Sequence, residues 1–228
     1  MNPLQTREKE VLIALKKLRG ARFVVIGGYA VNAYTLPRFS VDCDIVIAHK
    51  EGLARIGNVL IKLGYRRGEY RDFDASGSFA RYEKSLGGSF RVSFDVLIGK
   101  VLDRQTAASI AWAWIFENSA VRTLRGKTIA ERLKVRVIDL DALCVLKLIS
   151  CRATDIRDIF MLAPSIKDPI WVRGEVALRC DFNERLSKAK SDITSRQFRD
   201  GLQGVYGLVD DQTFNRNLDA FLELGRTN

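Results

Sequence analysis

Two aspartates in the segment DCDIVI have the residue type and spacing of a metal-binding pair. Asp42 and Asp44 are separated by one residue, in a run where apolar side chains recur at every second position, the period of a β-strand. Residues two apart on a strand project to the same face, so the two carboxylates share one space and repel each other. Mg²⁺, a hard cation that prefers oxygen ligands, is the expected counter-charge.

A third carboxylate, Asp95, is expected on a different strand. In Phe90–Ile98 every second residue is apolar, which leaves Arg91, Ser93 and Asp95 together on the other face. Three carboxylates can hold two metal ions about 3.5–4 Å apart, the arrangement used for in-line phosphoryl displacement. The sequence therefore predicts a two-metal site on Asp42, Asp44 and Asp95, provided that the two strands lie side by side.

A pair of glycines, Gly27 and Gly28, follows a short β-branched run and precedes a predicted helix. A turn without Cβ atoms lets backbone amides approach phosphate oxygens, and a following helix N-terminus favours negative charge. Arg38 and Ser40 come just before the paired aspartates, where they could contact a phosphate or shape the turn. Each of these features is common by itself, but their combination in this order is rare.

The elements that would position these residues can be read from the spacing of apolar side chains. Strands are predicted over Phe23–Ile26, Asp42–Ile47, Phe79–Lys84, Phe90–Ile98 and Lys134–Ile138. Helices are predicted over Leu4–Leu18, Tyr29–Leu36, Gly52–Leu63, Arg104–Glu117, Asp139–Ser150, Thr154–Ala163, Asn183–Lys190, Thr194–Leu202 and Gln212–Leu224. The expected architecture is an α/β (α+β) domain over residues 1–138, with a small mixed sheet flanked by helices, followed by an all-helical domain over residues 139–228.

The net charge of +10 is unevenly distributed along the chain. Residues 150–228 contain 12 basic and 12 acidic side chains, so the excess lies in the first 149 residues. Such an excess suits a polyanionic partner or a solvated basic surface. The same alternatives apply to one basic run: Arg122, Arg125, Lys127, Arg132, Lys134 and Arg136.

Composition excludes several other classes of protein. No apolar run approaches the ~20 residues of a membrane span, and the N-terminus lacks the apolar core of a signal peptide, so a cytoplasmic location without a membrane partner is expected. The four cysteines form no CxxC pair and there is one histidine, which disfavours a zinc site and histidine-based catalysis. Buried free thiols are expected instead.

The order strand, Gly-Gly, helix, D-x-D strand and later acidic strand resembles the nucleotidyltransferase superfamily, which includes DNA polymerase β, kanamycin and lincosamide nucleotidyltransferases and bacterial toxin nucleotidyltransferases. The stretch from Arg38 to Asp44 is similar to the R-x-[ST]-x-D-x-D form of the toxin and stand-alone branches. The resemblance implies that the three aspartates are catalytic and bind two Mg²⁺ ions. It also implies that Gly27, Gly28, Arg38 and Ser40 bind the nucleotide.

A second stretch, Asp139–Leu162, is similar to a helical segment of abortive-infection-type nucleotidyltransferases with the pattern K-x-x-x-x-R-x-x-D-x-x-D. Lys147, Arg152, Asp155 and Asp158 fall on this pattern. The resemblance implies that Lys147 reaches the triphosphate and that Asp158 orients Lys147 or anchors the helix pair. A polar stripe on two packed helices is the competing interpretation.

The two resemblances predict an Mg²⁺-dependent nucleotidyltransferase that uses an NTP such as ATP and releases pyrophosphate. The basic N-terminal part and the toxin-like motifs favour RNA, for example the end of a tRNA, or a partner protein as the acceptor, as in a toxin–antitoxin system. The alternative is a non-catalytic nucleotide- or RNA-binding module that keeps the fold. The three carboxylates disfavour that alternative, since their loss is the usual mark of an inactive relative.

Overall fold

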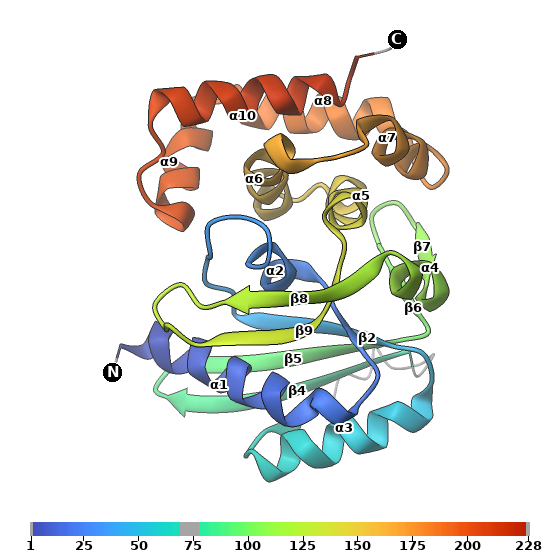
Figure 1. The fold of residues 1–228 in the computed structure, drawn as a ribbon, viewed down its shortest axis with the longest axis vertical. Coiled ribbons are helices and arrows are strands. Elements are labelled where there is room, and N and C mark those ends of the chain that lie inside the picture. The colour runs from blue at the N-terminus through green and yellow to red at the C-terminus, as the bar shows by residue number, and fades with distance from the viewer. Residues whose placement is uncertain (1, 69–77, 227–228) are drawn as a thin grey trace. The chain divides into compact units, whose positions relative to one another are not determined.

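The computed structural model describes residues 2–68 and 78–226 and divides into two compact units (Figure 1). Unit 1 consists of Met1–Ala33, Pro37–Val101 and Ile110–Ile138. Unit 2 consists of Tyr34–Leu36, Leu102–Ser109 and Asp139–Asn228. Within the described part of the chain, no helix combines the length and the apolar character needed to cross a bilayer.

Unit 1 is built on a seven-stranded mixed sheet with the strand order β3-β4-β5-β2-β1-β9-β8. The pairs β2–β5 and β1–β9 are parallel and the other neighbours are antiparallel. The strands of this sheet are β1 (Val24–Val25), β2 (Asp42–Ile47), β3 (Arg66–Arg67), β4 (Phe79–Gly87), β5 (Phe90–Ile98), β8 (Ser119–Arg125) and β9 (Arg132–Ile138). The strand alternation predicted for β2 and β5 is confirmed, which places the apolar residues of both strands in the core.

Helices cover the two faces of this sheet unequally. Helices α1 (Pro3–Lys17) and α3 (Lys50–Lys62) lie on one face, whereas the short α2 (Gly27–Val31) lies on the other (Figure 1). Asn2 caps helix α1: its side chain accepts a hydrogen bond from the backbone N–H of Leu4 in a capping box. The face with α2 is therefore the one on which polar strand residues can remain accessible.

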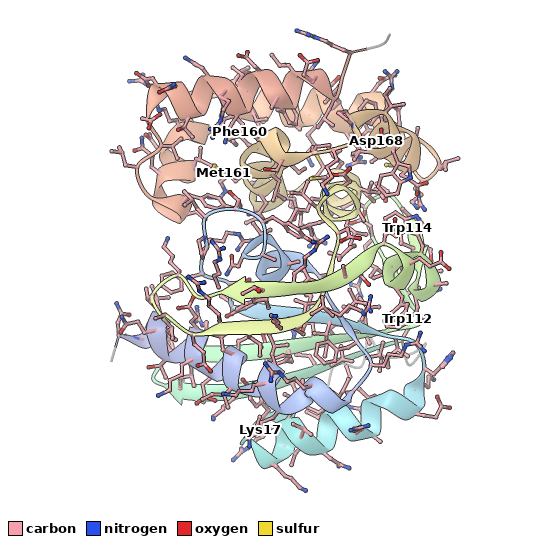
Figure 2. The ribbon with its side chains drawn as sticks, viewed as in Figure 1. Lys17, Trp112, Trp114, Phe160, Met161 and Asp168 are labelled. Atoms are coloured by element: carbon pink, nitrogen blue, oxygen red, sulfur yellow. The ribbon has the colours of Figure 1, made fainter. Side chains whose placement is uncertain are left out.

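Unit 2 is mainly helical. Its helices are α5 (Leu140–Ser150), α6 (Ala153–Leu162), α7 (Pro169–Ala177), α8 (Phe182–Ile193), α9 (Arg196–Tyr206) and α10 (Asp211–Glu223). Their core includes Phe160, labelled in Figure 2, whose ring lies 5.2 Å from that of Phe198 and 4.9 Å from that of Phe214.

The four cysteines of the chain are free, and Cys180 is the one that is not fully buried.

Part of the predicted secondary structure is wrong. The helix predicted over Arg104–Glu117 is replaced by β6 (Lys100–Leu102), β7 (Ser109–Ala111) and the shorter α4 (Trp112–Glu117). The carboxylate of Asp103 accepts hydrogen bonds from the backbone N–H groups of Gln105 at 3.0 Å and Thr106 at 2.9 Å. This local turn competes with helix formation, as Asp side chains commonly do. Strand β8 and helix α7 were not predicted, and the helix expected over Tyr29–Leu36 starts at Gly27 and ends at Val31.

Candidate active site

Strands β2 and β5 bring the three predicted carboxylates onto one face of the sheet. In their parallel pairing, Asp44 is opposite Asp95 and Asp42 is opposite Ser93. Directly paired residues project to the same side of a sheet, so the alternation on each strand places Asp42, Asp44 and Asp95 together. The Ser93 hydroxyl donates a hydrogen bond to Oδ1 of Asp42, which ties β5 to β2 at the site.

The turn Gly27–Gly28 lies directly against two of the other predicted residues. Gly27 has a φ of +64°, and a Cβ placed there would collide with Oδ2 of Asp44 and come within 2.9 Å of its Cγ. A Cβ on Gly28 would lie 2.6 Å from Oγ of Ser40 and 3.0 Å from Nη2 of Arg38. The absence of side chains at both positions is thus what allows Asp44, Ser40 and Arg38 to approach this turn.

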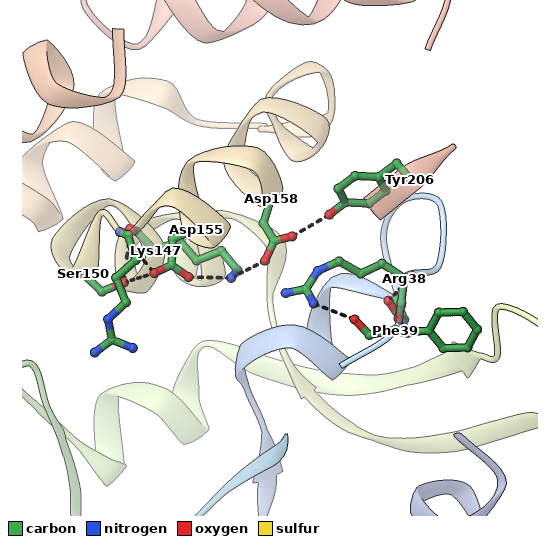
Figure 3. Close-up of polar contacts among 9 residues, drawn as sticks. Arg38, Phe39, Lys147, Ser150, Asp155, Asp158 and Tyr206 are labelled. Atoms are coloured by element: carbon green, nitrogen blue, oxygen red, sulfur yellow. Dashed lines mark hydrogen bonds and ion pairs between the residues drawn. The ribbon is translucent and has the colours of Figure 1, made fainter. Parts of the chain in front are cut away.

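Asn32 positions the loop that carries Arg38, and it was not predicted as a site residue. This side chain is 2% exposed. Its Nδ2 donates to the carbonyl oxygen of Arg38 and its Oδ1 accepts from the backbone N–H of Arg38, both at 3.0 Å. The guanidinium of Arg38 donates through Nη1 to the carbonyl oxygen of Phe39 at 3.0 Å (Figure 3). The only signal for Asn32 in the sequence is a polar residue within an otherwise apolar segment.

Arg81 on β4 is the second unpredicted member of the site. Its Nε donates to Oδ1 of Asp95 and its Nη2 donates to Oδ2, each at 2.6 Å. The same Nη2 lies 3.9 Å from Oδ1 of Asp42. Burial raises the pKa of Asp95 above its usual value, the hydrogen bonds and charge of Arg81 oppose that rise, and the charge of Asp42 adds to it. Arg81 therefore serves as a counter-charge for the most buried of the three carboxylates.

Comparisons with known proteins identify the fold. No protein-family model and no curated protein sequence matches the chain. Among solved structures, a protein described as a "putative nucleotidyltransferase" from Helicobacter pylori is 19% identical with a TM-score of 0.51, and the alignment covers 99% of this chain and 92% of that one. JHP933 from Helicobacter pylori is 18% identical with a TM-score of 0.50, covering 99% of this chain and 90% of that one.

The fold is that of a nucleotidyltransferase. The predicted fold class, a mixed α/β sheet with flanking helices and a helical C-terminal part, is confirmed.

The nucleotidyltransferase fold raises the question of whether these residues can hold Mg²⁺. Asp42 and Asp44 supply the hard oxygen ligands that this ion prefers, they lie on one face of the sheet, and Asp44 lies against the Gly27–Gly28 turn. Both oxygens of Asp95 are bound to Arg81. Among the described residues, no three His, Cys, Asp or Glu side chains are grouped as a metal site. The residues fit an ion on Asp42 and Asp44, and Asp95 can join only where Arg81 releases it.

Lys147, predicted to bind the nucleotide, lies in unit 2 within a buried polar network (Figure 3). Its ammonium is bound to Oδ1 of Asp155 at 2.9 Å and to Oδ2 of Asp158 at 2.6 Å. The other oxygen of Asp158 accepts from the Tyr206 hydroxyl at 2.5 Å, and Asp155 accepts from the Ser150 hydroxyl at 2.6 Å. These contacts join α5 to α6 and to Tyr206, the last residue of α9.

Replacing Arg81 with glutamine is expected to raise the pKa of Asp95 further, because the opposing hydrogen bonds and charge are lost while the burial remains. A folded-state pKa above the unfolded value means that stability falls as pH rises through that window. In Arg81→Gln the decrease in the free energy of unfolding with rising pH should be larger and should extend to higher pH. The carboxyl titration of Asp95, followed by ¹³C NMR, measures the shift.

The matched control is Arg91→Gln, which removes an exposed arginine from the same strand as Asp95. It should leave the titration unchanged. An unchanged Asp95 titration in Arg81→Gln would show that the ion pair does not control this carboxylate.

Proposed function

We propose that the protein is a metal-dependent nucleotidyltransferase that transfers an NMP from an NTP to a hydroxyl group of an acceptor, RNA or a partner protein. The proposal depends on the contacts of the glycine turn. The Asp44 carboxylate lies against Gly27, and the side chains of Arg38 and Ser40 lie against Gly28. Asp95 is paired with Asp44 across β2 and β5. This arrangement places acidic ligands for a cation next to a side-chain-free turn that can receive phosphate.

In this proposal the triphosphate binds over Gly27–Gly28, where the guanidinium of Arg38 and the hydroxyl of Ser40 contact phosphate oxygens. Asp42 and Asp44 would hold Mg²⁺, and a second ion would share them with Asp95. Bound Mg²⁺ supplies positive charge that neutralises the phosphate oxygens and favours ionisation of the acceptor hydroxyl. Positioning and charge neutralisation account for most of the rate enhancement in this class of reaction.

In this proposal Asp95, once Arg81 releases one of its oxygens, accepts the proton of the acceptor hydroxyl. Its raised pKa makes it a stronger base than an exposed aspartate, and Arg81 keeps it from being raised further. The acceptor oxygen then forms a bond to the α-phosphorus, the bond between the α-phosphorus and the bridging oxygen to the β-phosphate breaks, and pyrophosphate leaves. In this proposal Arg38 balances part of the charge on the leaving group.

The experiment is to incubate the protein with each α-labelled NTP, Mg²⁺ and either total cellular RNA or whole lysate. Label is expected in RNA or in a protein, and Asp44→Asn should reduce its incorporation by roughly 10²–10³-fold, the scale for loss of one charge-stabilising group at a reaction centre. Asp219→Asn is the control, since it makes the same change at an exposed residue of α10.

Transfer at the wild-type rate by Asp44→Asn would contradict the proposed site. NTP binding without any labelled acceptor in lysate would favour the second candidate, a non-catalytic nucleotide- or RNA-binding module. The observation in favour of that candidate is the bidentate contact between Arg81 and Asp95, which occupies the third carboxylate.

A further inference from the structure

Unit 1 contains a basic pocket that the proposed transfer reaction does not use. It has a volume of about 430 Å³ and lies between the segment after α1, the end of α4 and the strands β8 and β9. A volume of this size is in the range of small-ligand sites. The residues that matter for its chemistry are four cations and one ring: Arg19, Arg22, Lys134, Arg136 and Phe116.

Two guanidinium groups in the pocket are fixed by stacking on the same aromatic ring. The guanidinium carbon of Arg22 lies 4.2 Å from the centroid of Phe116, and that of Arg136 lies 4.5 Å from it. Nη1 of Arg136 also donates to the carbonyl oxygen of Ser119 at 2.8 Å. Stacking holds a guanidinium plane in place while leaving N–H groups at its edge, so these arginines are pre-organised to bind phosphate or to stack on a base.

The positive charge continues from the pocket along β9. Arg132, Lys134 and Arg136 are alternate residues of this strand, so they project to one face at intervals of about 6.6 Å. Arg125 on β8 is directly opposite Arg132. Like charges at directly opposed positions destabilise a sheet, so this pair weakens the β8–β9 ribbon unless an anion lies over it.

Neighbouring carboxylates do not neutralise this strip. Of the ion pairs found between described residues, none involves Arg22, Arg132, Lys134 or Arg136. A further cation borders the pocket, because a Cβ on Gly20 would collide with the guanidinium of Arg55. The pocket and the strip therefore form one surface of unpaired positive charge, interrupted by an aromatic ring and the exposed side chain of Val121.

We propose that this surface binds single-stranded RNA, with successive phosphates on the β9 cations and a base at the arginines stacked on Phe116. A linear row of cations matches a chain of regularly spaced phosphates better than it matches a folded acidic surface. The stacked guanidinium planes suit unpaired bases, which a duplex would not present. Binding here requires neither the three aspartates nor an NTP.

The test is fluorescence anisotropy with a labelled single-stranded oligoribonucleotide, without NTP, over a range of salt concentrations. The variant Arg132→Gln/Lys134→Gln removes two exposed cations that make no ion pair among the described residues, so folding should be preserved. The slope of log K against log salt concentration should become less negative by about 1.4, since each phosphate contact on a single strand contributes about −0.7. The loss should be similar for oligonucleotides of different sequence.

The control is Lys50→Gln/Lys62→Gln, which removes the same charge from α3. An equal loss of affinity in the control would show that binding depends on diffuse charge, and would overturn the proposal. Displacement of the RNA by polyglutamate at equal charge concentration would also overturn it and indicate an acidic protein partner. RNA binding is measured without NTP and label incorporation is measured separately, so this site and the transferase proposal can fail independently.

Discussion

Replacing Asp158 with alanine is expected to lower the free energy of unfolding by about 3–5 kcal/mol, the range for removal of one partner from a buried ion pair. Asp158 is 1% exposed and is bound to both the ammonium of Lys147 and the hydroxyl of Tyr206. The change removes a carboxylate bound to the buried ammonium of Lys147 and to the buried hydroxyl of Tyr206. Urea unfolding followed by circular dichroism measures the loss.

Two further variants make this result specific to the pair. Asp200→Ala removes an exposed carboxylate from α9 and should change stability by less than about 0.5 kcal/mol. Lys147→Met/Asp158→Leu removes the ammonium and the more buried of its two carboxylates, while Asp155 keeps the hydrogen bond from Ser150. It should recover part of the loss, since apolar replacement of a buried pair is often close to neutral. A loss below about 1 kcal/mol in Asp158→Ala would mean that the network does not hold the helices of unit 2 together.

Replacing Gly27 with alanine is expected to disable the candidate active site. A residue with a side chain in the left-handed region loses about 1–2 kcal/mol relative to glycine, and the φ of Gly27 is +64°. The added Cβ must also displace the Asp44 carboxylate, which it would otherwise overlap. We therefore expect nucleotidyl transfer to fall by roughly 10²-fold or more, measured as the initial rate of label incorporation alongside a thermal unfolding curve.

The matched control for Gly27→Ala is Gly88→Ala. Gly88 has a φ of +55°, and nothing lies within 4 Å of a Cβ built there. Both variants should lose stability because both place a side chain at positive φ, and Gly27→Ala should lose more because it also displaces Asp44. Transfer should fall only in Gly27→Ala. Equal activity in the two variants would show that the approach of Asp44 to the turn has no role in catalysis.

The faces of the strands could be predicted from the sequence because their period is short and local. Alternation alone placed Asp42 and Asp44 on one face of β2, and it placed Asp95 opposite the apolar residues of β5. The neighbour relation between β2 and β5 could not be derived this way. It is a parallel pairing of distant segments, and its prediction depended on a resemblance to a known fold.

Arg81 illustrates why the remaining part of the site could not be predicted. Counting back from the pair Gly87–Phe90 in a regular hairpin would place Tyr82 opposite Asp95. A β-bulge between Ser85 and Gly87 shifts the register by one residue and brings Arg81 opposite Asp95 instead. A one-residue shift in register moves every side chain of a strand to the opposite face of the sheet. The sequence of residues 85–87 contains no signal that predicts this bulge.

The errors in predicting β8 and α2 also come from tertiary context that the local sequence does not show. Strand β8 is rich in charged and exposed residues because it lies at the edge of the sheet, so its sequence shows little alternation. Helix α2 was placed too far along the chain because glycine is a poor helix former, yet the helix begins at Gly27. In both cases tertiary context decided the structure against local propensity.

The order of strands in the sheet has a consequence for the chain during its synthesis. Strand β1, which leads into the glycine turn, lies between β2 and β9, and β9 is the last strand of the sheet to leave the ribosome. Before residue 138 emerges, β1 has only one of its two neighbours and the turn is held from one side. A nascent chain can thus align Asp44 with Asp95 early, whereas we expect the glycine turn to be fixed in a single late step, when β9 completes the sheet.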